Sequence, residues 1–216
     1  MLTAMSSARR SSSGSGMKPE VKVCGVRDAA FAVAAAKLGV DYLGFIFEPS
    51  SPRHVTISQA AEIDASLGAD PRRRVRLVGV FVRESTDEIA AAMRRAGLDV
   101  VQLHRRASAA DVAALKAAGY EVWTLAGGAE GDGVLFDSSH GDGERELRRG
   151  AYRTILAGGV SAGNVAMAVA AGPDVLDVNS SLETAPGIKS AARLEDFMRA
   201  FAAATAADNA KGKGMK

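Results

Sequence analysis

The sequence contains a single cysteine, Cys24, among its 216 residues. One thiol excludes an intrachain disulfide and a zinc site made of several cysteines, and it suits a reducing cytoplasm. No spacing of histidines and carboxylates is typical of a metal site either. We therefore expect a cytoplasmic protein that has no structural metal.

Aromatic residues and net charge are also scarce. Aromatic side chains make up 5% of the chain and the formal net charge at pH 7 is +2, so the stacking surfaces and the basic field of a nucleic-acid-binding protein are lacking. No apolar run approaches the roughly 20 residues that a membrane-spanning helix needs. What is present, 47% hydrophobic and 24% charged residues, is ordinary for a globular protein with one sizeable core. We expect no nucleic-acid or membrane partner.

Both ends of the chain are polar. The first sixteen residues, "MLTAMSSARRSSSGSG", lack the apolar segment of a secretory signal. They could be a flexible extension, sequence upstream of a start at Met17, or an organellar transit peptide. We expect a disordered extension over residues 1–17, one folded domain over residues 18–206 and a disordered tail over residues 207–216.

Short apolar segments alternate with Ala-rich helical segments through the middle of the chain. The expected strands cover residues 21–25, 42–47, 76–82, 100–104, 121–126, 133–138, 154–159 and 175–180. The expected helices cover residues 28–39, 58–68, 85–97, 108–119, 161–172 and 190–204. Strands that are apolar on both faces and separated by helices are typical of a parallel sheet covered by helices.

The junctions between helices and strands repeat. Each expected helix end of the form Gly-x-Asp or Gly-x-Glu has a glycine where a left-handed residue is needed, at Gly39, Gly97, Gly119 and Gly172. Serines stand where helix N-caps are expected, at Ser58, Ser85, Ser108, Ser161 and Ser190. One βα unit, used repeatedly, explains this pattern.

Eight such strands can close into a barrel or remain an open, doubly wound sheet. Two observations favour the barrel. The first strand is not followed by the Gly-x-Gly-x-x-Gly motif that is typical of a doubly wound sheet. Polar residues also follow many of the strands, whereas an open sheet would concentrate them at one switch point. These polar residues are Cys24, Arg53, His104, Asp137, Gly158 with Gly159, and Ser180 with Ser181. We predict an α/β fold, a single eightfold β/α (TIM) barrel of parallel strands, with the open sheet as the alternative.

Cys24 lies near the end of the first strand, in Val-Lys-Val-Cys-Gly. A free cysteine is commonly a small buried hydrophobic residue, so packing is the alternative to chemistry. Because side chains alternate along a strand, Lys22 and Cys24 share one face, which in a barrel is the inside. A buried lysine needs a partner, and Asp177 on the neighbouring eighth strand is the candidate. Such a cation beside Cys24 would favour its thiolate.

Two further charged residues follow strands. Asp137 ends an apolar strand, where a carboxylate either caps a turn or, if desolvated in the barrel mouth, keeps its proton and acts as a general acid. Cys24 and Asp137 would then project from separate strands into one mouth, which suits an acid and a base that work on opposite sides of a small substrate. Arg53 lies between prolines in a stiff loop and could clamp a carboxylate, the alternative being a solvated surface arginine.

A phosphate site is expected after the last two strands. Gly158 and Gly159 precede a helix, so backbone N–H groups and the positive helix end could meet an anion there. Ser180 and Ser181 would complete this site, as is common in barrels, although a plain tight turn is the alternative. A hydrolase that pairs the cysteine with His104 is a weaker possibility, because no nucleophile elbow surrounds any serine.

Together these motifs resemble the phosphoribosylanthranilate isomerase family of tryptophan biosynthesis. The matching stretches are "VKVCG", "YLGFIFEPSSPRHV", "VGVFV", "VVQLH", "LFDS", "LAGGVSAGNV" and "DVNSSLETAPGIKS". Lys-x-Cys-Gly with Ser-Pro-Arg-x-Val is specific, whereas Leu-Ala-Gly-Gly is shared with other phosphate-binding barrels. The resemblance implies a β/α barrel that uses no cofactor. It also implies an Amadori rearrangement of N-(5-phosphoribosyl)anthranilate to 1-(2-carboxyphenylamino)-1-deoxyribulose 5-phosphate.

The resemblance further implies roles for individual residues. By motif, Cys24 removes the C2′ proton as general base, Asp137 protonates the ring oxygen as general acid, and Arg53 holds the anthranilate carboxylate. We place the other substrate-binding and supporting residues at Gly158, Gly159, Ser180, Ser181, Asp177 and Lys22.

Three segments differ from the family pattern. Residues 139–152 are charged and lack the usual Gly-Thr-Gly-rich loop with an aromatic pair, Ser181 replaces a glycine, and Arg105 with Arg106 follows Leu-His. None of these differences removes an expected catalytic group. The functional alternatives are the related histidine-biosynthesis isomerase or a dual-substrate barrel, which use an aspartate where Cys24 stands, and a phosphate-binding barrel without turnover. Both a monomer and a homodimer remain open.

Overall fold

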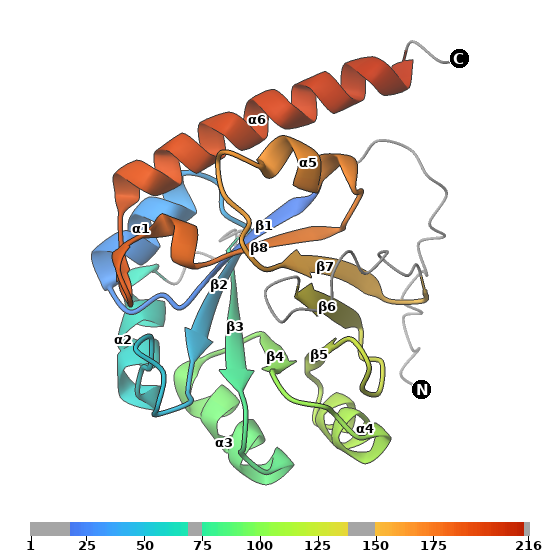
Figure 1. Ribbon diagram of the computed structural model, residues 1–216. Helices are drawn as coiled ribbons and strands as arrows, with labels where there is room; N and C mark the ends of the chain where they lie inside the picture. Colours follow the sequence, from blue (N-terminus) through green and yellow to red (C-terminus); the bar gives the residue numbers. More distant parts are fainter. Residues whose placement is uncertain (1–17, 69–74, 138–149, 214–216) are drawn as a thin grey trace, which may run out of the picture.

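The structure, a computed structural model, describes residues 18–68, 75–137 and 150–213. Eight parallel strands pair in chain order and β8 pairs with β1, so the predicted closed barrel is confirmed (Figure 1). The strands are β1 (Glu20–Cys24), β2 (Tyr42–Ile46), β3 (Arg76–Phe81), β4 (Val100–Leu103), β5 (Glu121–Leu125), β6 (Gly133–Asp137), β7 (Arg153–Ala157) and β8 (Val175–Val178). The expected extension over residues 1–17 and most of the charged segment after Asp137 (138–149) lie outside the described residues.

Helices pack on the outside of the barrel. They are α1 (Ala29–Lys37), α2 (Ile57–Ser66), α3 (Thr86–Ala96), α4 (Ala109–Ala117), α5 (Val165–Ala170) and α6 (Ala191–Lys213). After β8 the chain forms a 3-10 helix, η2 (Ser180–Leu182), and a hairpin of β9 (Glu183–Ala185) and β10 (Ile188–Lys189).

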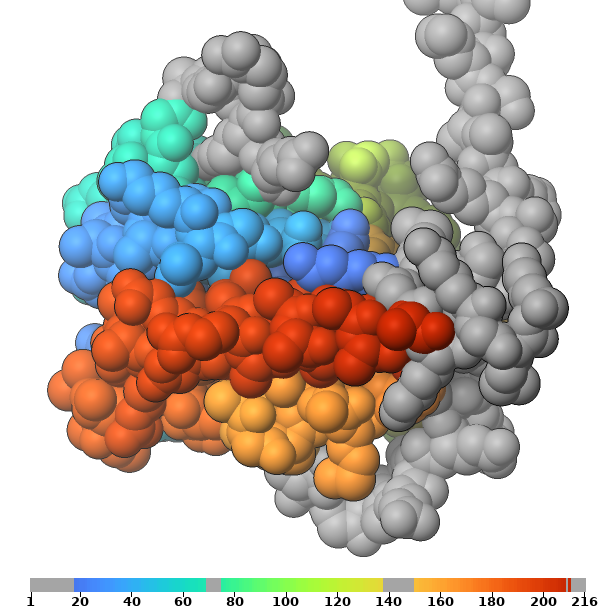
Figure 2. Space-filling model, turned by 90° about the horizontal axis from the view of Figure 1, so that it is seen from above, coloured from blue at the N-terminus to red at the C-terminus, as the bar shows by residue number. Residues whose placement is uncertain are grey.

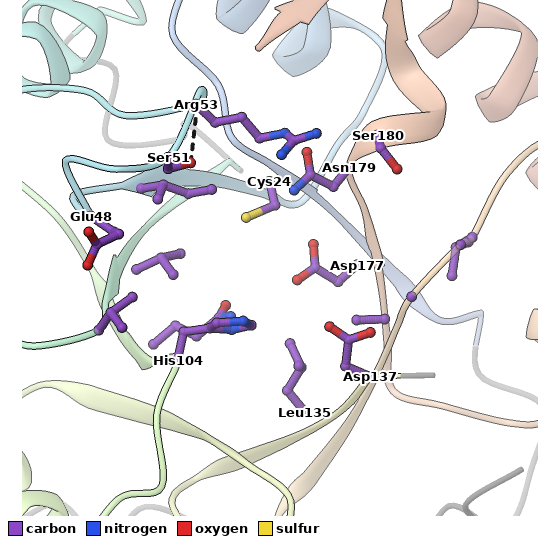
Figure 3. A pocket seen from close by; sticks show the side chains of 18 residues that line it. Cys24, Glu48, Ser51, Arg53, His104, Leu135, Asp137, Asp177, Asn179 and Ser180 are labelled. Atoms are coloured by element: carbon purple, nitrogen blue, oxygen red, sulfur yellow. Dashed lines mark hydrogen bonds between the residues drawn. The ribbon is translucent and has the colours of Figure 1, made fainter. Parts of the chain in front are cut away.

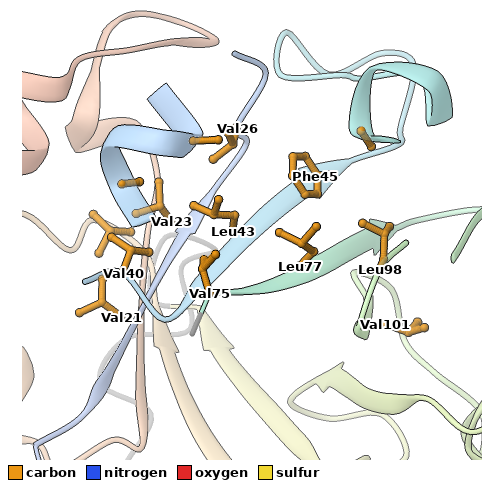
Figure 4. Close-up of a cluster of buried hydrophobic side chains, with 14 of the residues drawn as sticks. Val21, Val23, Val26, Val40, Leu43, Phe45, Val75, Leu77, Leu98 and Val101 are labelled. Atoms are coloured by element: carbon orange, nitrogen blue, oxygen red, sulfur yellow. The ribbon is translucent and has the colours of Figure 1, made fainter. Parts of the chain in front are cut away.

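The strands alternate between an outer and an inner layer of side chains. Val21 and Val23 face outward with Leu43 and Phe45, in the main hydrophobic core under the helices (Figure 4). A second cluster fills the inside of the barrel, and it consists of Tyr42, Val78, Val100, Trp123, Leu135, Ile155, Ala157 and Val175. The prediction that the two valines of β1 pack on helices while their neighbours face inward is confirmed.

The Gly-x-acid junctions hold the strands together at the amino end of the barrel. The glycines adopt positive φ angles of 82°, 65°, 92° and 72°, as predicted, at Gly39, Gly97, Gly119 and Gly172. Asp41 then accepts the backbone N–H of Val21 at 2.8 Å, and Asp174 accepts that of Thr154 at 2.7 Å. Asp41 and Asp174 therefore each anchor the strand beside the one that they open.

Most of the predicted helix caps are present. Backbone N–H groups of the following helix are capped by Ser85, Ser108 and Ser190. The prediction for Ser58 is wrong, because α2 begins earlier and Thr56 caps it. Thr56 accepts from the Gln59 backbone while the Gln59 side chain accepts from Thr56, which forms a reciprocal capping box.

The last helix is longer than expected. It runs to Lys213, past residue 207, where we expected the polar tail to begin. Figure 2 shows α6 lying lengthwise across one side of the barrel, between α1 and α5. In the described part of the chain, no helix is both long and apolar enough to span a bilayer.

Charged and aromatic residues fill the amino end of the barrel. Arg153 donates to Glu20 and to the hydroxyl of Tyr42, while Arg76 donates to Glu121 at 2.6 Å. Both arginines also lie 5.7 Å from the centre of the Tyr42 ring. In β/α barrels this end serves stability, and the active site lies at the opposite end.

Candidate active site

The polar residues expected at the strand ends gather in one pocket at the carboxyl end of the barrel (Figure 3). Its volume is about 390 Å³, within the range of roughly 300–1,000 Å³ that is typical of small-molecule sites. Of the residues singled out in the sequence, Cys24, Arg53, His104, Asp137, Gly158, Gly159, Asp177 and Ser180 line it. Lys22 and Ser181 are not among the lining residues.

An ion pair lies at the base of the pocket beside Cys24. Nζ of Lys22 donates to Oδ2 of Asp177 at 2.7 Å, and the two residues face each other in the register of β1 and β8. The Lys22 side chain is completely buried and that of Asp177 is 7% exposed. The predicted pair is therefore confirmed, and it follows from strand alternation and barrel closure alone.

Lys22 acts on the thiol in the expected direction, but burial outweighs it. Burial raises the pKa of the Cys24 thiol, and although the Lys22 cation acts against this, the pKa stays above its usual value. Asp177 also acts to raise the pKa of the thiol, against the effect of Lys22. Desolvation thus decides the ionisation of Cys24 in the free protein.

Two glycines leave the space that the thiol and its neighbours occupy. A Cβ atom at Gly44 would lie 3.1 Å from Sγ of Cys24 and 3.2 Å from Cε of Lys22. A Cβ atom at Gly25 would lie 2.7 Å from Cδ of Arg53, and Gly25 also has a φ of 72°. The glycine after the cysteine therefore lets the Arg53 side chain cross β1 close to the thiol.

Two buried oxygens of the pocket, on strands β4 and β8, lack a hydrogen-bond partner among the described residues. They are Oδ1 of Asp177 and Oε1 of Gln102, whose residues are 7% and 2% exposed. Unpaired buried polar groups are costly, so such atoms at a pocket wall are suited to accept donors from a ligand. Gln102 was missed in the sequence, although a polar residue at an inward position of an apolar strand is a usable signal.

Asp137 ends β6 on a different wall of the same pocket. It pairs in register with Ala157 on β7, and its half-buried carboxylate projects into the cavity, as does the sulfur of Cys24 (Figure 3). A thiol and a carboxyl group on separate strands can reach different atoms of one small ligand. Cys24 and Asp137 therefore project from separate strands into a shared space, as expected.

Arg53 lines the pocket but is already engaged by a carboxylate. Its Nε and Nη2 donate to the two oxygens of Glu183, at 2.8 Å and 2.7 Å. Lys189 donates to the same carboxylate at 2.8 Å and to Asn179 Oδ1 at 2.7 Å. The simple alternative of a solvated surface arginine does not describe Arg53, whose side chain is 21% exposed. No sequence pattern had pointed to Glu183 or Lys189.

The two glycines after β7 form a sharp bend beside the pocket. Gly158 and Gly159 have φ angles of 88° and 67°, which only glycine adopts readily. The prediction that Ser161 caps the following helix is wrong, because α5 begins at Val165 and Asn164 is its N-cap residue. Asn164 instead ties the bend together, accepting from the Ser161 N–H at 2.8 Å and donating to the Gly159 carbonyl at 2.9 Å.

The serines after β8 differ in position. Ser180 lines the pocket, while Oγ of Ser181 donates to the carbonyl of Val160 at 2.6 Å. The hydroxyl of Ser181 therefore joins the loop after β8 to the loop after β7, instead of projecting into the cavity. Both loops expected to hold a phosphate are held side by side by this bond.

The arginines after β4 do not line the pocket. Arg105 donates to Asp111 of α4 at 2.7 Å, which directs its charge toward the helix layer, and Arg106 is exposed. His104 does line the pocket, on the wall formed by the end of β4. Four other polar lining residues, beyond those expected, are Glu48, Ser51, Gln102 and Asn179.

Comparison with protein families gives a match over most of the chain. The family model described as "N-(5'phosphoribosyl)anthranilate (PRA) isomerase" matches residues 21–200. An N-(5'-phosphoribosyl)anthranilate isomerase from Granulibacter bethesdensis is 34% identical, covering 85% of this chain and 98% of its own length.

Solved structures of other proteins are also similar to this chain. TrpF from Jonesia denitrificans has a TM-score of 0.75 with 30% identity, and the alignment covers 87% of this chain and 98% of the other. A phosphoribosyl anthranilate isomerase in complex with reduced 1-(o-carboxyphenylamino)-1-deoxyribulose 5-phosphate has a TM-score of 0.74 with 25% identity. That alignment covers 86% of this chain and 99% of the other.

Proposed function

The chain belongs to the N-(5'-phosphoribosyl)anthranilate isomerase family, and we propose that the pocket at the carboxyl end of its barrel performs this isomerisation with Cys24 as base and Asp137 as acid. The reaction is the Amadori rearrangement of N-(5′-phosphoribosyl)anthranilate to 1-(2-carboxyphenylamino)-1-deoxyribulose 5-phosphate, a step of tryptophan biosynthesis. The observation that carries the assignment of roles is the projection of Cys24 and Asp137 from separate strands into one cavity.

The first step opens the ribose ring. Asp137, as the acid, gives its proton to the ring oxygen while the bond between C1′ and that oxygen breaks. The lone pair of the anthranilate nitrogen forms the new bond to C1′, which leaves a protonated Schiff base. Asp137 suits this role because it stands at the end of β6, at the edge of the cavity.

The second step moves a proton from carbon. The Cys24 thiolate removes the C2′ proton, the C–H electrons form a C1′=C2′ double bond, and the Schiff-base nitrogen regains its lone pair. The resulting enolamine tautomerises to the amino ketone. Burial raises the pKa of the thiol, so the thiolate is a stronger base once formed than an exposed one would be.

The remaining lining residues hold the unreactive parts of the substrate. Gly158 and Gly159 would offer backbone N–H groups to the phosphate, together with the loop at Ser180. Because α5 is only six residues long and begins at Val165, we assign the phosphate contacts to the loops and not to the helix. Ser181 contributes by joining these two loops.

The other ends of the substrate meet charged residues. The unpaired Oδ1 of Asp177 would accept a hydrogen bond from a hydroxyl of the opened sugar, and Lys22 holds that carboxylate in place. Arg53 would bind the anthranilate carboxylate beside its own partner Glu183. We expect the reaction to need no cofactor, and we expect the protein to work in the cytoplasm as a monomer or a homodimer.

The test of the two roles is turnover of phosphoribosylanthranilate, followed by the loss of its fluorescence. Wild-type protein should remove the signal far faster than the spontaneous background, with kcat/KM rising with pH as the thiol ionises. Cys24→Ser should lower kcat by roughly 100-fold or more, because general base catalysis contributes about that much and a hydroxyl is a far weaker base. It should fold like the wild type, since the side chains are nearly the same size.

Two results would change the assignment. Unchanged turnover in Cys24→Ser would make Cys24 a packing residue, and no turnover by wild-type protein would favour a phosphate-binding barrel without activity. The histidine-pathway and dual-substrate alternatives are disfavoured by the cysteine itself, because those enzymes resemble this chain but use an aspartate at this position. A turnover assay with the histidine-pathway substrate separates them directly.

A further inference from the structure

Glu183 stands between two cations at the pocket mouth. Its side chain is 4% exposed, and its two oxygens accept from Nε and Nη2 of Arg53. Lys189, which is 3% exposed, donates to the same carboxylate and to the carbonyl and side-chain oxygens of Asn179. The three charged side chains therefore form one buried cluster, which we call the mouth cluster, made of Arg53, Glu183 and Lys189.

The geometry of the guanidinium group leaves room for a second carboxylate. Arginine has five N–H donors in a planar fork, and a carboxylate can pair with either of two edges. Glu183 occupies the edge formed by Nε and Nη2. The other edge, formed by Nη1 and the second N–H of Nη2, has no hydrogen-bond partner among the described residues, and the guanidinium lies close to Cys24 and Asn179 at the pocket wall (Figure 3).

The charge of the mouth cluster suits an anionic ligand. Burial acts to raise the pKa of Glu183, but the hydrogen bonds from Arg53 and Lys189 outweigh it and lower that pKa to about 2. With Glu183 ionised, Arg53 and Lys189 leave the cluster with one unbalanced positive charge. A ligand carboxylate on the open edge of Arg53 would neutralise that charge in a partly desolvated place.

The hairpin and the arginine loop are fitted to each other. Gly187, in the turn between β9 and β10, has a φ of 82°, and a Cβ atom there would lie 2.3 Å from the carbonyl oxygen of Pro52. Arg27 donates to the same carbonyl at 3.1 Å. The turn therefore packs directly against Pro52, the residue before Arg53. This contact keeps Glu183 aligned with the loop that carries Arg53.

We propose that Glu183 is a positioning residue that fixes the guanidinium of Arg53 with its open edge toward the pocket, so that the carboxylate of the aromatic ring is bound there. Lys189 holds Glu183 in place from the other side. This inference rests on the proposed function, because it assigns the carboxylate of that same substrate to Arg53. Glu183 takes no part in the proton transfers.

A matched pair of ligands tests the proposal without turnover. One is reduced 1-(o-carboxyphenylamino)-1-deoxyribulose 5-phosphate, and the other is its phenylamino counterpart, which lacks only the carboxylate. Their dissociation constants would be measured by isothermal titration calorimetry with the wild type and Glu183→Gln. The matched control is Glu121→Gln, which makes the same chemical change in a carboxylate paired with Arg76 at the opposite end of the barrel.

We expect Glu183→Gln to raise the dissociation constant of the carboxylated ligand by about tenfold or more, because a charge-assisted contact is lost. The dissociation constant of the phenylamino ligand should change by less than about threefold. Glu121→Gln should change neither constant. An equal rise in both dissociation constants would mean that Glu183 only stabilises the hairpin. Unchanged dissociation constants would mean that Glu183 has no role in binding. Either result overturns the proposal. Failure of the proposed function is read separately, in the turnover of wild type and Cys24→Ser.

Discussion

Replacing Lys22 with methionine would test the ion pair beneath the thiol. Nζ of Lys22 is 2.7 Å from Oδ2 of Asp177, in a pair whose side chains are 0% and 7% exposed. Methionine has a similar length and fills the same space, but it leaves the Asp177 carboxylate buried without its cation. Removal of one partner from a buried pair costs about 3–5 kcal/mol.

That loss is a large part of the stability of a single domain, which is about 5–15 kcal/mol. For a domain of this size, Tm falls by about 2–4 °C for each kcal/mol, so Lys22→Met should melt roughly 6–20 °C below the wild type. The assay is thermal unfolding by circular dichroism, with urea unfolding as the measure of free energy. The double variant Lys22→Met/Asp177→Leu should recover most of the loss, because an apolar pair leaves no buried charge.

Two results would refute this reasoning. The first is a single variant that melts within about 2 °C of the wild type, a change smaller than about 1 kcal/mol for a domain of this size. The second is a double variant no more stable than the single one, which would mean that packing and not charge sets the cost. Lys22 also lowers the pKa of Cys24 against burial, so kcat/KM of Lys22→Met should need a higher pH to rise.

Two other substitutions probe the walls of the pocket. Gly44→Ala would place a Cβ atom 3.1 Å from Sγ of Cys24, which is tighter than ordinary contact. Because the thiol would be displaced, kcat should fall by roughly 10- to 100-fold. An unchanged kcat would show that the fit around the thiol is not as close as this distance indicates. Arg53→Met should raise KM by about tenfold or more and leave kcat within about threefold, because the carboxylate contact is the same before and during the reaction; an equal fall in kcat and kcat/KM would contradict this.

The barrel and the pair beneath the thiol could be predicted because they follow from local rules. Side chains alternate along every strand, and a βα repeat with right-handed crossovers brings the first and last strands together. Once β1 and β8 are neighbours, Lys22 and Asp177 have to meet. The same alternation directs Cys24 inward, so its place in the pocket needed no knowledge of distant contacts.

The mouth cluster could not be predicted in this way. Glu183 lies 130 positions after Arg53, and the contact depends on how the loop after β2 and the hairpin after β8 fold over each other. Only the hairpin itself carries a local signal, since Pro-Gly between Glu183 and Lys189 is typical of a tight turn. The cap of α5 was mispredicted for a related reason: Asn164 closes the glycine bend before the helix begins, and nothing in the spacing marks that delay.

The direction of the Cys24 pKa could not be read from its neighbours in sequence either, because it depends on a balance of charges in three dimensions. Lys22 and Lys189 act to lower the pKa of the thiol, while Asp177 and burial act to raise it. Burial has the largest effect, and Asp177, the partner of Lys22, acts against that lysine. The net pKa of the thiol is therefore raised, so the thiolate is scarce but is a strong base once formed. A family motif identifies the thiol, but its burial, which outweighs the cations beside it, explains why kcat/KM should follow its ionisation upward with pH.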